Sequence, residues 1–111
     1  MTHESFFISH EVPWAEAGPG VKRQVLAHTP EMMIVRVKFE KGAVGSPHTH
    51  PHVQSCLVED GVFEVTVAGV TKRLQKGDGY LVKSDVEHGA VALEAGALID
   101  IFTPRRDDFL K

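Results

Sequence analysis

The sequence predicts an all-β protein built as one small barrel or sandwich, and two observations point to this fold class. From residue 31 onward, apolar and polar residues alternate over short runs, which is the period of a β-strand. Turn-forming stretches such as Asp60-Gly61 and Lys76-Gly77-Asp78-Gly79 separate these runs at short, regular intervals, as in β-sandwiches and barrels. No segment sustains a long helical period, except at the last few residues.

The expected strands follow one another along the chain. In the first, residues 31–39, Met33, Val35, Val37 and Phe39 occupy one face. Further strands are predicted over residues 53–59, 62–68, 70–75, 80–83, 88–93 and 97–103. Four turns are predicted between them, namely a hairpin at Asp60-Gly61, turns at Gly69 and at Lys76-Gly77-Asp78-Gly79, and a last turn at Glu94-Ala95-Gly96.

The 111 residues fit a single domain, residues 1–111. Residues 1–30 are predicted to form an N-terminal arm, because proline and glycine punctuate them and no helical period is sustained. The barrel is expected over residues 31–103 and a C-terminal tail over residues 104–111.

Composition restricts the class of partner and the compartment. The formal net charge of −3 argues against nucleic acid or an anionic membrane as the main partner, so an anionic substrate would need a local metal or arginine. The N-terminal residues lack the pattern of a signal peptide, and no apolar stretch is long enough to span a membrane, so a cytoplasmic location is expected. The single cysteine, Cys56, excludes an internal disulfide and is interpreted as a buried small hydrophobic residue.

Histidine is the first sign of chemistry, since seven occur in the chain and three lie within five positions. His48, His50, His52 and Gln54 are two residues apart, so in an extended strand they face the same way. Neutral imidazoles on a barrel wall suit many divalent metals. A His-x-His pair alone is equally consistent with a surface histidine run that binds no ligand.

The spacing around these residues is more specific. Gly42, His48, His50, Gln54 and Gly61 reproduce the pattern Gly-x5-His-x-His-x3-Glu-x6-Gly, with glutamine in place of the glutamate. This resembles the first cupin motif, and the stretch from Gly77 to His88 resembles the second, with Lys83 where proline is common and Ala92 where asparagine is common. The resemblance implies a cupin, a double-stranded β-helix or jelly-roll barrel. It also implies one divalent ion held by His48, His50, Gln54 and His88.

Glutamine as the fourth ligand has a chemical consequence. Its carbonyl oxygen is neutral, so the ion keeps its full charge and is a stronger Lewis acid. It is also less suited to high-valent iron, which argues against oxygenase chemistry. Zinc, nickel, iron, manganese and cobalt all remain open as the metal. His52 is expected not to be a ligand, because the cupin pattern does not use its position.

Asp100 is unusual because it lies between Ile99 and Ile101 in a strand that is otherwise apolar. By pattern alone it is either a buried structural partner of an arginine or an acid/base group directed into the barrel. Residues 48–54 and 100–110 together resemble the KdgF family of cupins, and residues 12–14 and 18–23 resemble the N-terminal arm of that family. Val53 departs from this family, in which glutamate is frequent at that position.

The KdgF resemblance implies an enzyme of pectin and alginate degradation. It implies conversion of 4,5-unsaturated monouronates into the linear 5-keto-4-deoxyuronate, with Asp100, Phe102 and Arg106 as the catalytic group. It also implies a homodimer with a small-molecule substrate. The alternatives are another metal-dependent cupin enzyme, such as a dioxygenase or a sugar isomerase, and a non-catalytic sugar-binding cupin module.

Overall fold

The computed structural model describes residues 5–111, which form eight β-strands and two short 3-10 helices. In chain order they are η1 (Ser9–Glu11), β1 (Ala15–Glu16), β2 (Val21–Thr29), β3 (Met32–Phe39), β4 (Val44–His48), β5 (Val53–Val67), β6 (Val70–Gln75), β7 (Gly79–Val82), β8 (His88–Thr103) and η2 (Asp107–Leu110). The all-β prediction is confirmed. Within these residues, no helix has the length and hydrophobicity needed to cross a lipid bilayer.

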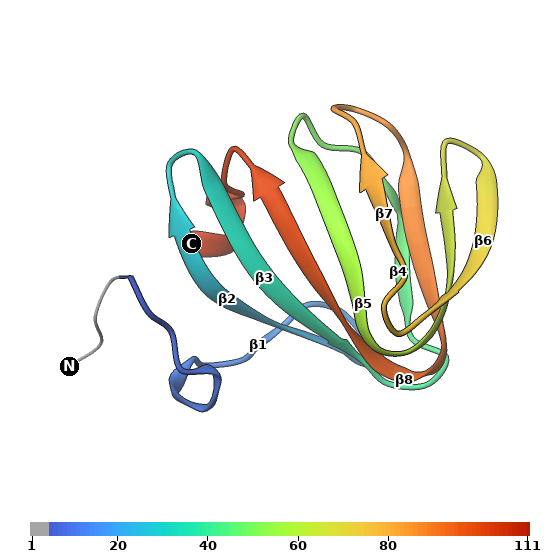
Figure 1. The fold of residues 1–111 in the computed structure, drawn as a ribbon, viewed down its shortest axis with the longest axis horizontal. Coiled ribbons are helices and arrows are strands. Elements are labelled where there is room, and N and C mark those ends of the chain that lie inside the picture. Colours follow the sequence, from blue (N-terminus) through green and yellow to red (C-terminus); the bar gives the residue numbers. More distant parts are fainter. Residues whose placement is uncertain (1–4) are drawn as a thin grey trace.

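The strands form two facing layers that share the long strands β5 and β8 (Figure 1). The main path of the sheet is β1-β2-β3-β8-β5-β6, with β4 paired to β8 and β7 paired to β5. In Figure 1, β2 and β3 lie in one layer with the red, C-terminal half of β8, which pairs with the first half of β5, and β7 pairs with that same half of β5. The orange, N-terminal half of β8 lies in the other layer, where it pairs with β4 and with the second half of β5, next to β6. Strands that pass from one layer to the other close the sheet on itself, as in a jelly roll.

Two predicted turns are wrong, because the chain continues as a strand through both. Asp60-Gly61 lies inside β5 and Glu94-Ala95-Gly96 lies inside β8, and the register between β5 and β8 shifts at this point. Gly61 has φ +85°, and a Cβ added there would lie 2.7 Å from the Cα of Gly96. The two glycines therefore allow the paired strands to bulge in close contact, and the same residues that form a hairpin turn elsewhere form a bulge here.

The predicted boundary between arm and barrel at residue 31 is also wrong, because β2 (Val21–Thr29) pairs with β3 along its length. Val21, Gln24 and Leu26 are buried, but their spacing does not alternate strictly. The register with β3 shifts between Val25 and Ala27, and this irregularity removes the simple alternation that identifies a strand. Residues 1–4 of the predicted arm lie outside the described residues.

Strand β4 (Val44–His48) was not predicted from the sequence, since Gly45 and Pro47 are poor strand residues. It pairs with β8, and the pairing places His48 opposite His88. The neighbouring prediction is confirmed in part: β5 begins at Val53, as expected, and Gln54 is its second residue.

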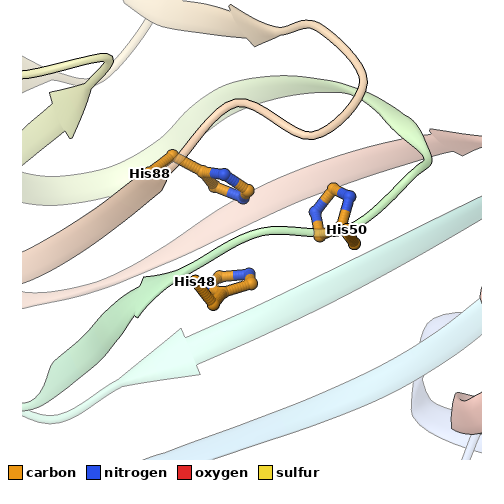
Figure 2. A group of neighbouring side chains, drawn as sticks. All are labelled: His48, His50 and His88. Atoms are coloured by element: carbon orange, nitrogen blue, oxygen red, sulfur yellow. The ribbon is translucent and has the colours of Figure 1, made fainter.

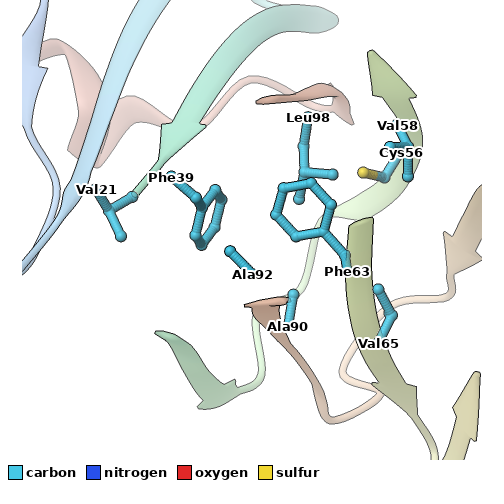
Figure 3. Packing of buried hydrophobic residues seen from close by; sticks show 9 residues of the cluster. All are labelled: Val21, Phe39, Cys56, Val58, Phe63, Val65, Ala90, Ala92 and Leu98. Atoms are coloured by element: carbon cyan, nitrogen blue, oxygen red, sulfur yellow. The ribbon is translucent and has the colours of Figure 1, made fainter. Parts of the chain in front are cut away.

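A hydrophobic core of nine buried residues packs between the strands (Figure 3). Phe39 from β3 and Phe63 from β5 meet edge to face, with ring centroids 5.2 Å apart. A second cluster, Met33, Val35 and Phe102, lies further along β3 and β8. The predicted inward face of residues 31–39 is confirmed, since Met33, Val35 and Phe39 are buried.

A polar network fastens the N-terminal segment to the outer face of β2. The side-chain amide of Gln24 is buried and donates to the carbonyl oxygens of Ser9 and Val12, at 2.8 and 2.9 Å. Arg36 on β3 donates to the oxygen of the same amide and forms a two-point salt bridge with Glu59. Every polar group in this network has a partner, so its burial carries little penalty.

Candidate metal centre

Three histidines from different parts of the chain converge, with His50 and His88 buried and His48 exposed (Figure 2). His48 ends β4, His50 lies in the loop that follows, and His88 begins β8. One ring nitrogen from each lies within 4.8 Å of the other two. Among the described residues this trio could hold a metal ion, and it contains the three predicted histidine ligands.

Hydrogen bonds fix which nitrogen of each ring faces the centre. The Nδ1 atoms of His48, His50 and His88 lie 2.8, 3.0 and 2.9 Å from the backbone carbonyl oxygens of residues 46, 52 and 86. A carbonyl oxygen only accepts, so each Nδ1 carries a hydrogen and donates it. Burial lowers the pKa of His50 and of His88, which favours neutral rings. Each neutral ring therefore leaves its Nε2 lone pair free, the arrangement found in metal-binding histidines.

Gln54 adds an oxygen to these nitrogens. Its Oε1 lies 3.0 Å from the Nε2 of His50 and 3.1 Å from the Nε2 of His88. With the hydrogens on Nδ1, lone pairs face one another across these short distances, which is unfavourable unless a cation lies among them. The donor set of three imidazoles and one amide oxygen therefore fits a divalent first-row metal.

The amide of Gln54 also connects this donor set to Asp100. The Nε2 of Gln54 donates to the Oδ1 of Asp100 at 3.0 Å. Asp100 lies on β8 and is only 7% exposed, although it is a carboxylic acid. Burial raises the pKa of Asp100 to about 6, against the opposing effect of hydrogen bonds from Cys56 and Gln54. The acid is therefore held next to the metal donors by a direct hydrogen bond.

Phe102 and Arg106 lie on the same side of the site. Phe102 is buried two residues after Asp100 on β8, and its ring meets that of His50 at a centroid distance of 5.7 Å. The guanidinium carbon of Arg106 lies 5.3 Å from the centre of the Phe102 ring. The Nε and Nη2 atoms of Arg106 donate to the two carboxylate oxygens of Asp108, at 3.0 and 2.9 Å. These contacts set the orientation of the guanidinium.

A cavity of about 230 Å³ joins these groups. Six of the seven predicted site residues line it: His48, Gln54, His88, Asp100, Phe102 and Arg106. The seventh, His50, is buried beside Gln54 and does not line the cavity. The volume lies below the 300–1,000 Å³ typical of sites for drug-sized ligands, so it suits one small molecule.

The sequence analysis gave no role to three further residues of the cavity wall, Arg23, Tyr80 and Phe109. Arg23 stands on β2 between Val21 and Val25, at alternate positions, so an inward-facing arginine could have been recognised had this stretch been predicted as a strand. Nothing in the sequence around Tyr80 or Phe109 marks either residue as part of a site.

His52 is a neighbour of the site. Its backbone carbonyl accepts the hydrogen bond from the Nδ1 of His50, and its ring lies edge-on to that of His50 at 5.4 Å. Its own Nδ1 is buried and has no hydrogen-bond partner among the described residues. His52 thus orients His50 through its backbone.

Comparison with known proteins places the chain in a family. The family model for the cupin domain matches residues 35–102. The pectin degradation protein KdgF of Dickeya dadantii is 45% identical over 107 residues, covering 95% of this chain and 97% of that protein. The structure of KdgF from Halomonas sp. has a TM-score of 0.91 at 48% identity, covering 94% of this chain and 98% of that one.

An RmlC-like cupin from Shewanella frigidimarina matches with a TM-score of 0.93 at 43% identity, over 96% of both chains. The agreement thus extends from the cupin motifs to nearly the whole chain, including the N-terminal segment and the C-terminal tail. The protein belongs to the cupin superfamily and, within it, to the KdgF family.

Proposed function

We propose that the protein is a metal-dependent enzyme that opens the ring of 4,5-unsaturated monouronates to give the linear 5-keto-4-deoxyuronate. The observation that carries the proposal is the direct hydrogen bond from Gln54, a member of the metal donor set, to the buried acid Asp100, in a cavity sized for one small molecule. Its membership of the KdgF family, in which a relative is named a pectin degradation protein, supports the same reaction.

The reaction requires one proton to be moved and one bond to be broken. The substrate has a C4=C5 double bond conjugated to its carboxylate, and its ring oxygen joins C5 to C1. Loss of the C1 hydroxyl proton and cleavage of the bond between C1 and the ring oxygen give an aldehyde at C1 and an enolate at C5. A proton added at C4 completes the 5-keto product. The proton lost equals the proton gained, so neither water nor a redox partner is consumed.

The residues of the cavity can carry out this sequence. Asp100 accepts the hydroxyl proton and returns a proton to C4, while Gln54 fixes one of its carboxylate oxygens. The Nη1 of Arg106 is not engaged by Asp108 and provides positive charge for the substrate carboxylate. Phe102 packs against the sugar ring and excludes water.

The donor set completes the proposed site. His48, His50, Gln54 and His88 would hold one divalent ion, and such an ion supplies a Lewis acid that stabilises negative charge on substrate oxygens. Because C4 and C5 are both trigonal in the substrate, unsaturated uronates from pectin and from alginate differ little in shape. We therefore propose that both are accepted. The cytoplasmic location stays a prediction from the sequence.

A turnover assay tests the proposed function. Protein loaded with one divalent metal at a time is mixed with unsaturated galacturonate made by a polysaccharide lyase, and the ultraviolet absorbance of the conjugated alkene is followed. We expect loss of absorbance faster than in the enzyme-free control, an effect that a chelator removes and added metal restores. A sample of verified metal content that does not accelerate the loss contradicts the proposal, and oxygen consumption is then the next measurement.

We also propose that the protein is a homodimer joined through the outer face of β5, β7 and β8. Leu57 and Leu81 are 50% and 58% exposed, and the strand register places Leu81 opposite Ser55, on the same face as Leu57. Ile99 and Ile101 on β8 pair with Leu57 and Ser55, so they extend the same apolar face. A second copy of the chain would cover this face through a two-fold axis.

Light scattering coupled to size-exclusion chromatography tests the dimer. We expect Leu57→Glu to weaken self-association at least about tenfold, because a charge would be buried in the contact. Val70→Glu is the matched control, since Val70 is 59% exposed on β6, which pairs with β5 beyond the bulge. A wild-type protein that is monomeric at every concentration, or equal effects of the two variants, would exclude this interface.

A further inference from the structure

A second arginine faces the cavity in addition to Arg106. Arg23 lies on β2 at alternate positions with Val21 and Val25, both of which pack against the hydrophobic clusters of the interior. Its guanidinium carbon lies 3.9 Å from the centre of the Phe109 ring, and it lines the same cavity as Asp100. Arg23 therefore belongs to the inner wall of the barrel and not to the surface of an arm.

Arg23 differs from the other arginines near the interior in having no acceptor. Arg106 is engaged by Asp108 and Arg36 by Glu59, each through two hydrogen bonds. Within residues 5–111, the guanidinium of Arg23 makes no hydrogen bond or ion pair, and its contact is with the ring of Phe109. Partial burial lowers the pKa of Arg23, with Asp108 opposing this effect and Arg106 adding to it. A half-buried cation whose donors have no acceptor is suited to receive an anion.

The charges around the cavity also favour the binding of an anion. Arg23 and Arg106 both lie against Phe109, with guanidinium carbons 3.9 and 4.3 Å from its centroid. Asp100 is the one carboxylate in the wall, and Gln54 already donates to it. The wall therefore carries two guanidinium groups and one carboxylate, and Asp108, which pairs with Arg106, does not line it. Two neighbouring guanidinium groups repel one another, and a bound anion relieves this repulsion.

We propose that Arg23 determines specificity for uronates by binding the substrate carboxylate through its planar guanidinium fork, together with Arg106. The inference rests on the proposed function for the identity of the substrate, but the preference for an anion follows from the wall of the cavity alone. Because the carboxylate carries its full charge in both the substrate and the transition state, Arg23 contributes mainly to the binding that the two states share. Its loss therefore raises KM more than it lowers kcat.

The test compares three variants of the metal-loaded protein. Arg23→Met removes the charge but keeps a long apolar side chain against Phe109. Arg23→Lys keeps the charge without the fork. Lys22→Met is the matched control, since Lys22 is the exposed neighbour on the opposite face of β2. Metal content and thermal melting establish that each variant is folded.

With unsaturated galacturonate, Arg23→Met is expected to raise KM about 10- to 100-fold, the loss typical of a charged hydrogen bond, while kcat changes less than about threefold. Arg23→Lys falls between Arg23→Met and the wild type, and Lys22→Met resembles the wild type. If Arg23→Met has the KM of Lys22→Met, Arg23 does not bind the carboxylate, and the proposed function is unaffected.

Calorimetric titration with galacturonate and with galactose gives a readout that needs no turnover. The wild type is expected to bind galacturonate more tightly than galactose, and Arg23→Met is expected to lose that preference. If the wild type shows this preference and Arg23→Met loses it, but the protein does not open unsaturated uronates, the role of Arg23 stands and the proposed function is wrong. Equal binding of both sugars by the wild type overturns the role of Arg23.

Discussion

The fourth ligand position holds the amide of Gln54, and the contacts of this side chain explain why a carboxylate is not used there. Its oxygen faces the Nε2 atoms of His50 and His88, and its nitrogen donates to Asp100 at 3.0 Å. A glutamate here would place a second carboxylate at hydrogen-bond distance from the first, and two such groups cannot both be ionised easily. The amide therefore lets one side chain serve a metal and a carboxylate at the same time.

The role of Asp100 is tested by Asp100→Asn, which keeps an oxygen that can accept from Gln54 but removes the acid. We expect kcat to fall about 10²- to 10⁴-fold, the usual contribution of a general acid/base, with metal content unchanged. Steady-state kinetics and elemental analysis measure the two quantities.

Asp107→Asn is the matched control for this change. It makes the same substitution at an exposed carboxylate of the tail, whose partner is Arg105, and should retain wild-type activity. An Asp100→Asn enzyme as active as this control would remove Asp100 from the proton transfer.

At the residue scale, the donor set could be predicted because it depends on local spacing. His48, His50 and Gln54 lie close together in the chain, and a second motif supplies His88. Arg23 could not be predicted in the same way, because its place depends on how β2 pairs with β3. A residue brought to the site by strand pairing leaves no fixed spacing to the other site residues.

At the scale of elements, β5 and β8 hold the molecule together because each belongs to both layers (Figure 1). Their crossing depends on Gly61 and Gly96, which lie too close for either to carry a side chain. Beyond this crossing, β8 presents Leu98 to the core and then Asp100 and Phe102 to the cavity. The bulge thus sets which residues of one continuous strand serve the core and which serve the site.

Gly61→Ala tests the crossing, with Gly69→Ala as its matched control. Both glycines have positive φ, +85° and +81°, so both substitutions carry the backbone cost of about 1–3 kcal/mol. Only at Gly61 does the new methyl group meet backbone, 2.6 Å from the carbonyl oxygen of Ala95.

Urea unfolding should therefore show a larger loss of stability for Gly61→Ala, by at least about 1 kcal/mol beyond the control. Equal losses in the two variants would mean that the strands have room to separate at this point.

The errors in predicting the elements share one physical cause, which is irregular pairing. Asp60-Gly61 carries a strong hairpin signal, but a glycine with positive φ serves a bulge as well as a turn. In β2 the bulge near Leu26 disturbs the alternation of apolar and polar residues. In β4, Gly45 and Pro47 are residues that rarely occur in strands, so the sequence does not predict a strand there. A strand with regular alternation, such as β3, could be predicted from the sequence because local pattern and final structure agree there.

At the scale of the whole molecule, the candidate site joins segments that are distant in the sequence. Strand β4 and the loop after it contribute two histidines, β5 contributes Gln54, and β8 contributes His88 at its start and Asp100 near its end. These segments come from both layers, so an ion bound among them would connect the layers. Metal binding and folding should therefore be coupled, because the donor set does not exist in the unfolded chain.

This coupling predicts that metal raises thermal stability and that the site histidines are needed for the effect. At a metal concentration one hundred times the dissociation constant, binding adds about 2.7 kcal/mol. For a domain near this size, that corresponds to a rise in Tm on the order of 10 °C. Scanning calorimetry of metal-stripped protein with and without Ni²⁺ or Mn²⁺ measures the rise for each ion.

The comparison that isolates the site uses His88→Ala and His10→Ala. His88→Ala removes a donor, so its Tm should rise much less on adding metal, whatever its starting stability. His10→Ala removes an exposed histidine of η1 and should keep the full rise. A rise that persists in His88→Ala would mean that the ion binds elsewhere. Since the Oε1 of Gln54 faces the Nε2 lone pair of His88 at 3.1 Å, removing that ring should also relieve their repulsion, so metal-free His88→Ala loses less stability than its buried ring alone implies.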